Sequence, residues 1–127
     1  MSGEAETKQI RVMVVEDHPD FRDLMEILLA RQSDIKLVAQ AGSLAEARNH
    51  AVRLEFDVAV LDLGLPDGDG VDLIADLRWA NPEVGVLVLS ASLDTASMER
   101  AAEADEIMDK LAPLDEVLGT LRRLGNA

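Results

Sequence analysis

Five polar residues of this chain stand at points where apolar runs end. Glu16 and Asp17 follow the first run, Asp62 closes the run in "DVAVLDLGLPDGDG", Ser90 closes another and Lys110 follows a short one. Three carboxylates brought together repel one another, and a hard divalent cation with oxygen ligands relieves that repulsion. Mg²⁺ suits such a set because it takes few carboxylates, keeps waters and bridges to phosphate oxygens. These residue types therefore predict a magnesium site, provided that the fold gathers them.

Apolar runs of strand length alternate with helical patterns five times along the chain. The runs lie at residues 11–15, 35–39, 58–61, 84–89 and, more weakly, 107–108. Three of them are nearly continuous in Val, Leu, Ile and Met, which is typical of strands covered on both faces. The alternation predicts a doubly wound α/β fold, in which a five-stranded parallel sheet carries helices on both faces. Ligands of such sheets bind beyond the carboxyl ends of the strands, where the five polar residues fall.

The first two expected helices begin with recognisable signals. Pro19 suits a first turn, and Leu24, Ile27 and Leu28 follow it at helical spacing with Arg31. Ser43 and Glu46 have the spacing of a capping box, which leads into a stripe of Ala47, Ala51 and Leu54. The predicted buried faces of these helices are therefore those two stripes.

The three later helices are predicted from the spacing of apolar residues and from residues that end helices. Leu73, Ile74 and Leu77 mark a third helix that stops before Asn81-Pro82, with Trp79 expected to pack partly near its end. Residues 95–104 are alanine-rich and acidic and predict a fourth helix. The last helix carries a stripe of leucines and valine within residues 114–124, interrupted by Gly119.

Composition limits the classes of protein that this chain can be. It has 127 residues, 48% of them hydrophobic, no cysteine and a net charge of −13. This length suits one domain, and the absence of cysteine excludes a disulfide scaffold and a thiolate metal site. No apolar run approaches the roughly 20 residues of a membrane span, and the acidity argues against direct nucleic-acid binding. We expect a cytoplasmic protein that contacts neither membrane nor nucleic acid.

The segments that carry these polar residues resemble a known family. "VMVVEDHP", "VAVLDLGLPDGDG", "VLVLSAS" and "IMDK" stand in the order and spacing of the receiver domains of two-component response regulators, of the CheY-like superfamily. The DHP, LPDGDG and VLVLSA pieces look most like receivers of the NarL/FixJ type. The resemblance implies a flavodoxin-like sheet with strand order 2-1-3-4-5. It places a receiver domain at residues 10–124, after a disordered tail at 1–9 and before a short C-terminal end at 125–127.

The resemblance also assigns roles to the polar residues. Asp62 would be the phosphoacceptor. Glu16 and Asp17 would bind Mg²⁺ together with Asp62, helped by the backbone carbonyl of Gly64. Such a domain would take its phosphoryl group from a histidine kinase, a phosphotransfer protein or a small phosphodonor. It would be a signalling domain that catalyses its own phosphorylation and dephosphorylation, and not an enzyme acting on other substrates.

Two further polar residues complete the expected machinery. By the same resemblance, Ser90 would hydrogen-bond the phosphoryl group and Lys110 would pair with its oxygens. His18, beside the acid pair, is expected at the rim of the pocket. Phosphorylation would switch an output interaction, with homodimerisation as one expected outcome.

The chain departs from the family pattern around the fifth strand. Family members usually carry an aromatic residue three positions before the lysine, and here that residue is Ile107. Glu103 and Glu106 stand where small residues are usual, and two residues separate Lys110 from Pro113. The phosphorylation chemistry looks intact, whereas its coupling to an output surface is open.

Three alternatives to a phosphorylated receiver remain from the sequence. "PDGDGVD" resembles a calcium loop, but Leu65 stands where the first carboxylate ligand belongs. A phosphatase with an aspartyl nucleophile usually has a second acid two residues later, where this chain has Gly64. The last alternative is an interaction module of receiver fold that is no longer phosphorylated.

Overall fold

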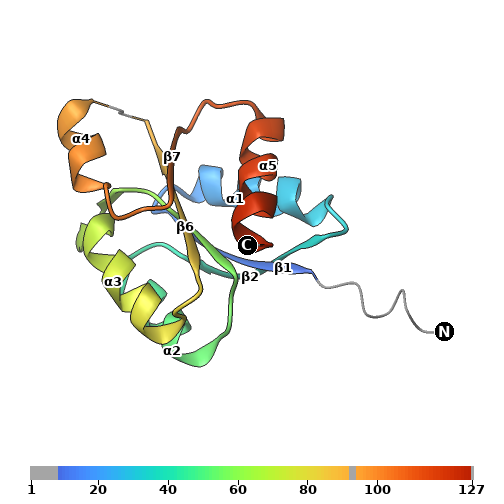
Figure 1. The fold of residues 1–127 in the computed structure, drawn as a ribbon, viewed down its shortest axis with the longest axis horizontal. Coiled ribbons are helices and arrows are strands. Elements are labelled where there is room, and N and C mark those ends of the chain that lie inside the picture. The colour runs from blue at the N-terminus through green and yellow to red at the C-terminus, as the bar shows by residue number, and fades with distance from the viewer. Residues whose placement is uncertain (1–8, 92–93, 127) are drawn as a thin grey trace.

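The computed structural model describes residues 9–91 and 94–126 of the chain, so all of the expected 1–9 tail except Gln9 lies outside the described residues, as does residue 127. Five strands form one sheet in the order β2-β1-β3-β6-β7, and every neighbouring pair is parallel (Figure 1). The strands are β1 (Ile10–Val15), β2 (Ile35–Ala41), β3 (Val58–Leu61), β6 (Gly85–Ser90) and β7 (Glu106–Asp109). Counted along the chain within this sheet, the order is 2-1-3-4-5, which confirms the expected fold class.

Helices cover both faces of the sheet. They are α1 (Pro19–Ala30), α2 (Leu44–Arg53), α3 (Gly70–Ala80), α4 (Thr95–Arg100) and α5 (Leu114–Gly125). In Figure 1, α1 and α5 lie on one side of the sheet and α2 and α3 lie together on the other. Two hydrophobic clusters correspond to these two layers. Alternate residues of the central strands enter one or the other cluster, because successive side chains of a strand point to opposite faces.

The buried face of α1 differs from the predicted stripe. Met25 and Leu29 are the buried residues of this helix, whereas Leu24 is 48% exposed and Ile27 is 53% exposed. Both sets have helical spacing, so periodicity alone does not decide which of them faces the sheet. Arg31 follows the helix as its C-terminal cap.

The capping box of α2 forms, with one difference from the pattern. The Ser43 Oγ accepts a hydrogen bond of 3.2 Å from the Glu46 backbone N–H, while Glu46 Oε1 accepts from the Gly42 N–H at 2.9 Å. The returning bond therefore reaches one residue further back than a standard box. Leu54, predicted on the buried stripe, is the C-terminal cap and is 38% exposed.

The fourth helix is shorter than predicted. It ends at Arg100, and none of its residues is buried, so little packing extends it. Arg78 of α3 donates to the Glu103 carbonyl at 2.7 Å, and the Asp105 carboxylate accepts from the Val86 N–H at 2.8 Å. These bonds direct residues after 100 into the turn that leads to β7, against the helical tendency of their alanines.

Trp79 is also placed differently from the prediction. Its side chain is 86% exposed, whereas Leu73, Ile74 and Leu77 take the buried face of α3. Residue 79 lies outside the arc that these three positions define on the helix. The expectation of partial packing is wrong.

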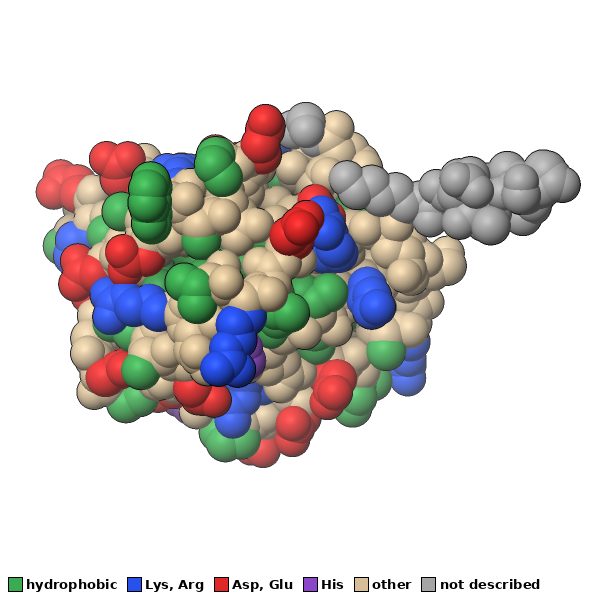
Figure 2. Space-filling view, turned by 90° about the horizontal axis from the view of Figure 1, so that it is seen from below, with side chains coloured by type: hydrophobic (Ala, Val, Ile, Leu, Met, Phe, Trp, Pro, Cys, Tyr) green, Lys and Arg blue, Asp and Glu red, His purple; other side chains and the backbone are tan. Residues whose placement is uncertain are grey.

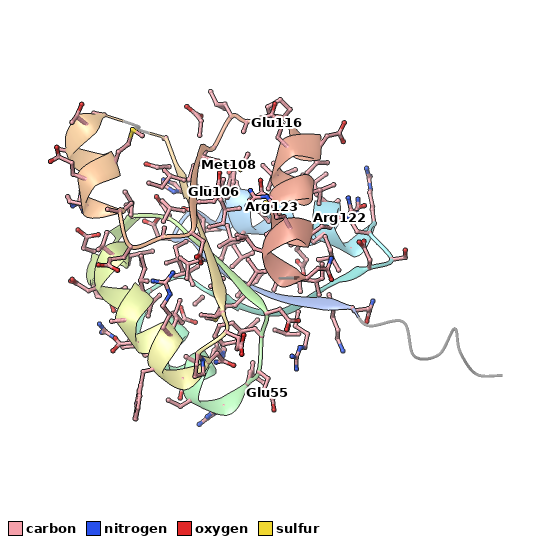
Figure 3. The ribbon with its side chains drawn as sticks, viewed as in Figure 1. Glu55, Glu106, Met108, Glu116, Arg122 and Arg123 are labelled. Atoms are coloured by element: carbon pink, nitrogen blue, oxygen red, sulfur yellow. The ribbon has the colours of Figure 1, made fainter. Side chains whose placement is uncertain are left out.

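Ion pairs attach the last turn of α5 to its neighbours. Arg122 contacts Asp34 before β2 at 2.7 Å. Arg123 lies 3.6 Å from Glu106 of β7, and Figure 3 labels both residues of this second pair. The described residues contain no helix long and apolar enough to cross a membrane.

Gly119→Ala is expected to stabilise the protein. Nothing lies within 4 Å of a Cβ added at Gly119, so alanine would remove the helix-propensity penalty of glycine without a clash. The gain should be about 1 kcal/mol, or about 4 °C in melting temperature for a domain of this size. Gly125→Ala is the control in the same helix, because its Cβ would approach Ile10 Cγ2 to 2.4 Å and should lower stability. Thermal melts giving both variants the same sign would contradict this packing.

Candidate functional site

The parallel sheet brings the predicted polar residues to one edge. Asp62 directly follows β3, Glu16 directly follows β1, and these two strands are neighbours. The Asp62 N–H donates to the Val15 carbonyl at 3.0 Å, and the Glu16 N–H donates to the Ala41 carbonyl at 2.8 Å. Because both backbones continue the ladder for one more residue, their side chains start from a rigid base.

Ser90 and Lys110 come from the next two strands in the sheet, and Asp17 directly follows Glu16 in the chain. Ser90 is the last residue of β6 and is 6% exposed, and Lys110 follows β7. The Lys110 N–H donates to the Ser90 carbonyl at 3.0 Å, which fixes the start of the lysine side chain at this edge. Every sequence-predicted side chain of the site therefore starts from the same end of the sheet.

Lys110 connects two of the carboxylates. Its Nζ lies 2.6 Å from Glu16 Oε1 and 3.1 Å from Asp62 Oδ2, and all three side chains are largely buried. The same Nζ lies 5.0 Å from the centre of the Phe21 ring, a cation–π contact that the sequence analysis does not predict. The lysine thus serves as the internal counter-charge of the site.

The electrostatics of the two bridged carboxylates differ. Burial would raise the pKa of Glu16, but hydrogen bonds from Lys110 and His18 outweigh it and hold that pKa below its usual value. Burial raises the pKa of Asp62, the Glu16 charge raises it further, and Lys110 offsets only part of this. Burial would lower the pKa of Lys110, but both carboxylates together raise it. The lysine is therefore charged at neutral pH, and Asp62 is the less stabilised anion.

His18 contributes more than the expected rim position. Its side chain is 68% exposed, in agreement with a place at the rim, and its Nδ1 lies 2.8 Å from Glu16 Oε2 and 3.3 Å from Asp17 Oδ1. The hydrogen bond to Glu16 raises the pKa of His18. In the described part of the chain, the only group of three or more His, Asp and Glu side chains close enough to share an ion is Glu16, Asp17, His18 and Asp62, whose ligand atoms lie within 4.8 Å of one another.

The donor set suits a hard divalent cation. Asp17 Oδ1 is buried and accepts no hydrogen bond among the described residues, because His18 Nδ1, although 3.3 Å away, directs its hydrogen bond to Glu16. A buried carboxylate oxygen without a partner is costly, and a metal ion would satisfy it. Carboxylate oxygens are the preferred ligands of Mg²⁺. The residues present therefore fit the ion that the sequence predicts.

The loop after Asp62 uses its acids for structure. β4 (Gly64–Leu65) and β5 (Gly68–Asp69) form a small antiparallel hairpin that the sequence analysis does not predict. Asp67 accepts from the Leu44 and Ala45 N–H groups at the start of α2, at 2.8 and 3.1 Å. This carboxylate serves a helix N-terminus, which argues against the calcium-loop alternative.

Glycines let this loop approach the acceptor. A Cβ at Gly70 would lie 2.3 Å from the Asp62 carbonyl oxygen, so no larger residue fits at the start of α3 without a shift. Gly68 has φ 151°, which favours glycine. Gly64 lies in β4, and its role as a carbonyl ligand stays a prediction.

A hollow lies at the opposite end of the strands from the carboxylate site. It has a volume of about 350 Å³, and its lining includes Arg11, Glu55 and Asp57. Arg11 pairs with Asp57 at 3.1 Å and with Glu55 at 3.4 Å, so a cation already faces both acids. Figure 2 looks at the molecule from below and shows acidic and basic side chains interspersed. This hollow carries no comparable gathering of reactive groups.

A family comparison agrees with this geometry. The family described as the response regulator receiver domain matches residues 12–121, and this chain belongs to that family. Among curated relatives, the response regulator protein PilR of Pseudomonas aeruginosa is 37% identical over 91% of this chain. The DNA-binding transcriptional activator DevR/DosR of Mycobacterium tuberculosis is 36% identical over 70% of it. The chain spans only 27% and 41% of these two proteins.

Solved structures show the same fold. The response regulator domain of Thermotoga maritima CheB has a TM-score of 0.83 at 25% identity, covering 94% of this chain and 98% of that one. The receiver domain of the response regulator NarL from M. tuberculosis has a TM-score of 0.80 at 28% identity, and the match covers 91% of this chain and 98% of that one. A Burkholderia pseudomallei response regulator, solved with a phosphorylated aspartic acid, a calcium ion and citrate, has 0.79 at 27%, covering 89% and 66%. The expected likeness to NarL-type receivers is confirmed.

Amide substitutions at Glu16 and Asp62 should change stability in opposite directions in metal-free buffer. A lowered folded-state pKa means that ionised Glu16 stabilises the fold above its unfolded pKa, and this is lost as pH falls through the folded pKa. A raised folded-state pKa means that protonated Asp62 is the form that the fold favours. Its contribution to the free energy of unfolding is therefore present below the pKa of the unfolded chain and is lost as pH rises through the folded-state pKa. Near neutrality, Glu16→Gln should cost about 2 kcal/mol, and Asp62→Asn should gain roughly 1 kcal/mol or less.

Denaturant titrations with a chelator would measure both effects. Glu26→Gln, an exposed change on α1, is the control for an amide substitution away from the site. Both differences should shrink when the buffer is acid enough to protonate the carboxylates. A stabilising Glu16→Gln would show that Lys110 does not compensate Glu16 as the distances indicate.

Proposed function

We propose that the chain is a phosphoacceptor receiver in which Asp62 takes a phosphoryl group in an Mg²⁺-dependent reaction. The observation that carries the proposal is the position of Asp62 at the end of a buried strand, where its Oδ2 lies 3.1 Å from the Lys110 ammonium and its carboxylate lies within 4.8 Å of those of Glu16 and Asp17. Family membership supports a phosphoacceptor role in two-component signalling. The phosphorylated aspartic acid of the B. pseudomallei relative supports an aspartate as acceptor.

The proposed chemistry is an in-line displacement at phosphorus. A carboxylate oxygen of Asp62 attacks, the bond from phosphorus to the donor's leaving atom breaks, and an aspartyl phosphate forms. The donor is a phosphohistidine of a histidine kinase or phosphotransfer protein, or a small phosphodonor, in the cytoplasm.

Each neighbouring residue has a proposed task. Glu16, Asp17 and Asp62, with the Gly64 carbonyl, hold the Mg²⁺, which neutralises charge on the transferring group. Lys110 moves one of its hydrogen bonds to a phosphoryl oxygen, and Ser90 donates its hydroxyl to another. The same residues admit the water that later hydrolyses the acyl phosphate, so the domain catalyses its own dephosphorylation. Phosphorylation then switches an output interaction, of which homodimerisation is one form.

Asp62→Asn should abolish phosphorylation. Incubation with a small phosphodonor and Mg²⁺, followed by intact-mass measurement, should show one phosphoryl group on the wild type and none on the variant, because an amide is not a nucleophile here. Asp67→Asn is the matched control in the same loop, where its remaining oxygen can still cap α2, and it should be labelled normally. Chelation of the metal should suppress labelling of the wild type and of Asp67→Asn.

The result also separates the alternatives. Donor turnover without a lasting adduct would favour an aspartyl phosphatase, and the absence of any reaction would favour an unphosphorylated interaction module. Wild-type labelling of Asp62→Asn would overturn the acceptor assignment.

Ile107 should move little on activation. It has no ring to swing inward and no phenolic hydroxyl, and it already packs, half-buried, against the cluster under α2 and α3. Structures with and without beryllofluoride should therefore keep the same Ile107 rotamer while the surroundings of the Asp62 carboxylate change. A rotamer change from exposed to buried would show that an aliphatic residue can serve as the switch.

A further inference from the structure

The outer side of α2 and α3 carries two strongly exposed apolar side chains. Trp79, the only tryptophan of the chain, is 86% exposed, and Val52 of α2 is 77% exposed. The two helices pack side by side on one face of the sheet (Figure 1). Tryptophan is among the residues most enriched at the energetic centres of protein interfaces. An exposed tryptophan in a chain with 2% aromatic residues therefore indicates a contact surface.

A hollow lies beside Trp79. Its volume is about 250 Å³, the scale of a large side chain, and we call it the α2–α3 hollow. Its lining consists of Arg48, Ala51, Val52, Asp76, Trp79 and Ala80. The small Ala51 and Ala80 side chains leave the space open. A protruding ring and a recess of similar size thus occupy one patch, which is the arrangement that a two-fold symmetric contact requires.

The charges around the hollow are also self-complementary. Arg48 of α2 and Asp76 of α3 form an exposed ion pair of 2.7 Å across its lining. Arg53 is another exposed base on α2, and Asp72 another exposed acid on α3, both outside the lining. The lining is therefore neutral in a chain of net charge −13, with its base on α2 and its acid on α3.

The remaining charges of the two helices are turned to other partners. Glu46 in the first turn of α2 accepts from the Gly42 N–H. Arg78 of α3 donates to the Glu103 carbonyl and pairs with Asp105 at 3.1 Å. If a second copy presents the same patch after rotation about a two-fold axis, basic α2 of each copy faces acidic α3 of the other.

We propose that the α2–α3 hollow is a self-association surface that binds a second copy of this chain about a two-fold axis. Trp79 of each copy lies in the hollow of the other, and Arg48 of each pairs with Asp76 of the other. A second copy is favoured because the same patch supplies both halves of the contact, the exposed ring with the recess and the base on α2 with the acid on α3. Arg48 and Asp76 pair with one another at 2.7 Å in the single chain, and a two-fold axis lets them exchange partners without burying an unpaired charge. The contact is independent of phosphorylation, since it uses no residue of the Asp62 site.

Charge reversal with cross-complementation tests this arrangement. Arg48→Asp alone and Asp76→Arg alone each place like charges opposite one another at both symmetric contacts. Each should weaken self-association by at least about tenfold, because two exposed pairs become repulsive. Mixing the two variants restores an opposite-charge pair at both contacts, so an equimolar mixture should associate as the wild type does.

Sedimentation and the fluorescence of Trp79 provide two readouts. Wild type should associate at concentrations up to about 1 mM, the weak end of specific binding, and Trp79 emission should shift to shorter wavelength as the ring is buried. Asp23→Arg on α1 and Arg31→Asp at its C-terminal cap are the controls. They change the net charge by the same amounts, lie at exposed positions and should leave association unchanged. Circular dichroism checks that all four variants are folded.

Three results would overturn the proposal. Wild type could remain monomeric over the whole concentration range. Association could persist undiminished in both hollow variants, which would place the contact elsewhere. Both variants could be monomeric without rescue on mixing, which would exclude a two-fold Arg48–Asp76 exchange.

Discussion

The site depends on one buried charge, the Lys110 ammonium between Glu16 and Asp62. Carboxylates that are 2% and 12% exposed are costly to ionise unless a cation faces them. A parallel sheet solves this because consecutive strands deliver their last residues to one edge, and β6 and β7 bring the lysine there from the far side of the acceptor. The hydrogen bond from the Lys110 N–H to Ser90 fixes where the side chain begins, and its length then lets it reach both acids.

The lysine does not serve the two acids equally. The Lys110 Nζ lies closer to Glu16, which also accepts a hydrogen bond from His18. For Asp62, burial and the repulsion from Glu16 outweigh the attraction of Lys110. This asymmetry explains why the pKa of Glu16 is lowered and that of Asp62 is raised. An approaching cation is therefore attracted most strongly to the Asp17 and Asp62 side of the cluster.

The sequence was informative where one strong regularity decides the outcome. Strands buried on both faces must be apolar throughout, so the polar residue that ends each of them marks the sheet edge, and Glu16, Asp62 and Ser90 could be placed from that alone. The exposure of Leu24 and the burial of Met25 could not be predicted in this way, because two stripes of α1 have equivalent spacing. The end of α4 at Arg100 depends on Arg78 and Asp105, which come from other elements. The contact of Lys110 with Phe21 depends on how α1 packs, and spacing carries no signal for it.

The same acid-rich stretch contains both reactive and structural carboxylates, and their different partners determine how the acceptor loop is held. Asp67 anchors the loop to the start of α2, and Asp69 caps α3 through the Val71 N–H at 3.0 Å while pairing with Arg100 of α4. The first two attachments end in backbone groups of helices that bury several side chains. The third is a partly exposed ion pair to a six-residue helix that buries none. Exposed ion pairs contribute about 1 kcal/mol or less, so α4 is the element held least firmly to this loop. A change of charge at Asp62 that shifts the loop would therefore break the Asp69–Arg100 pair before it breaks the attachments to α2 and α3.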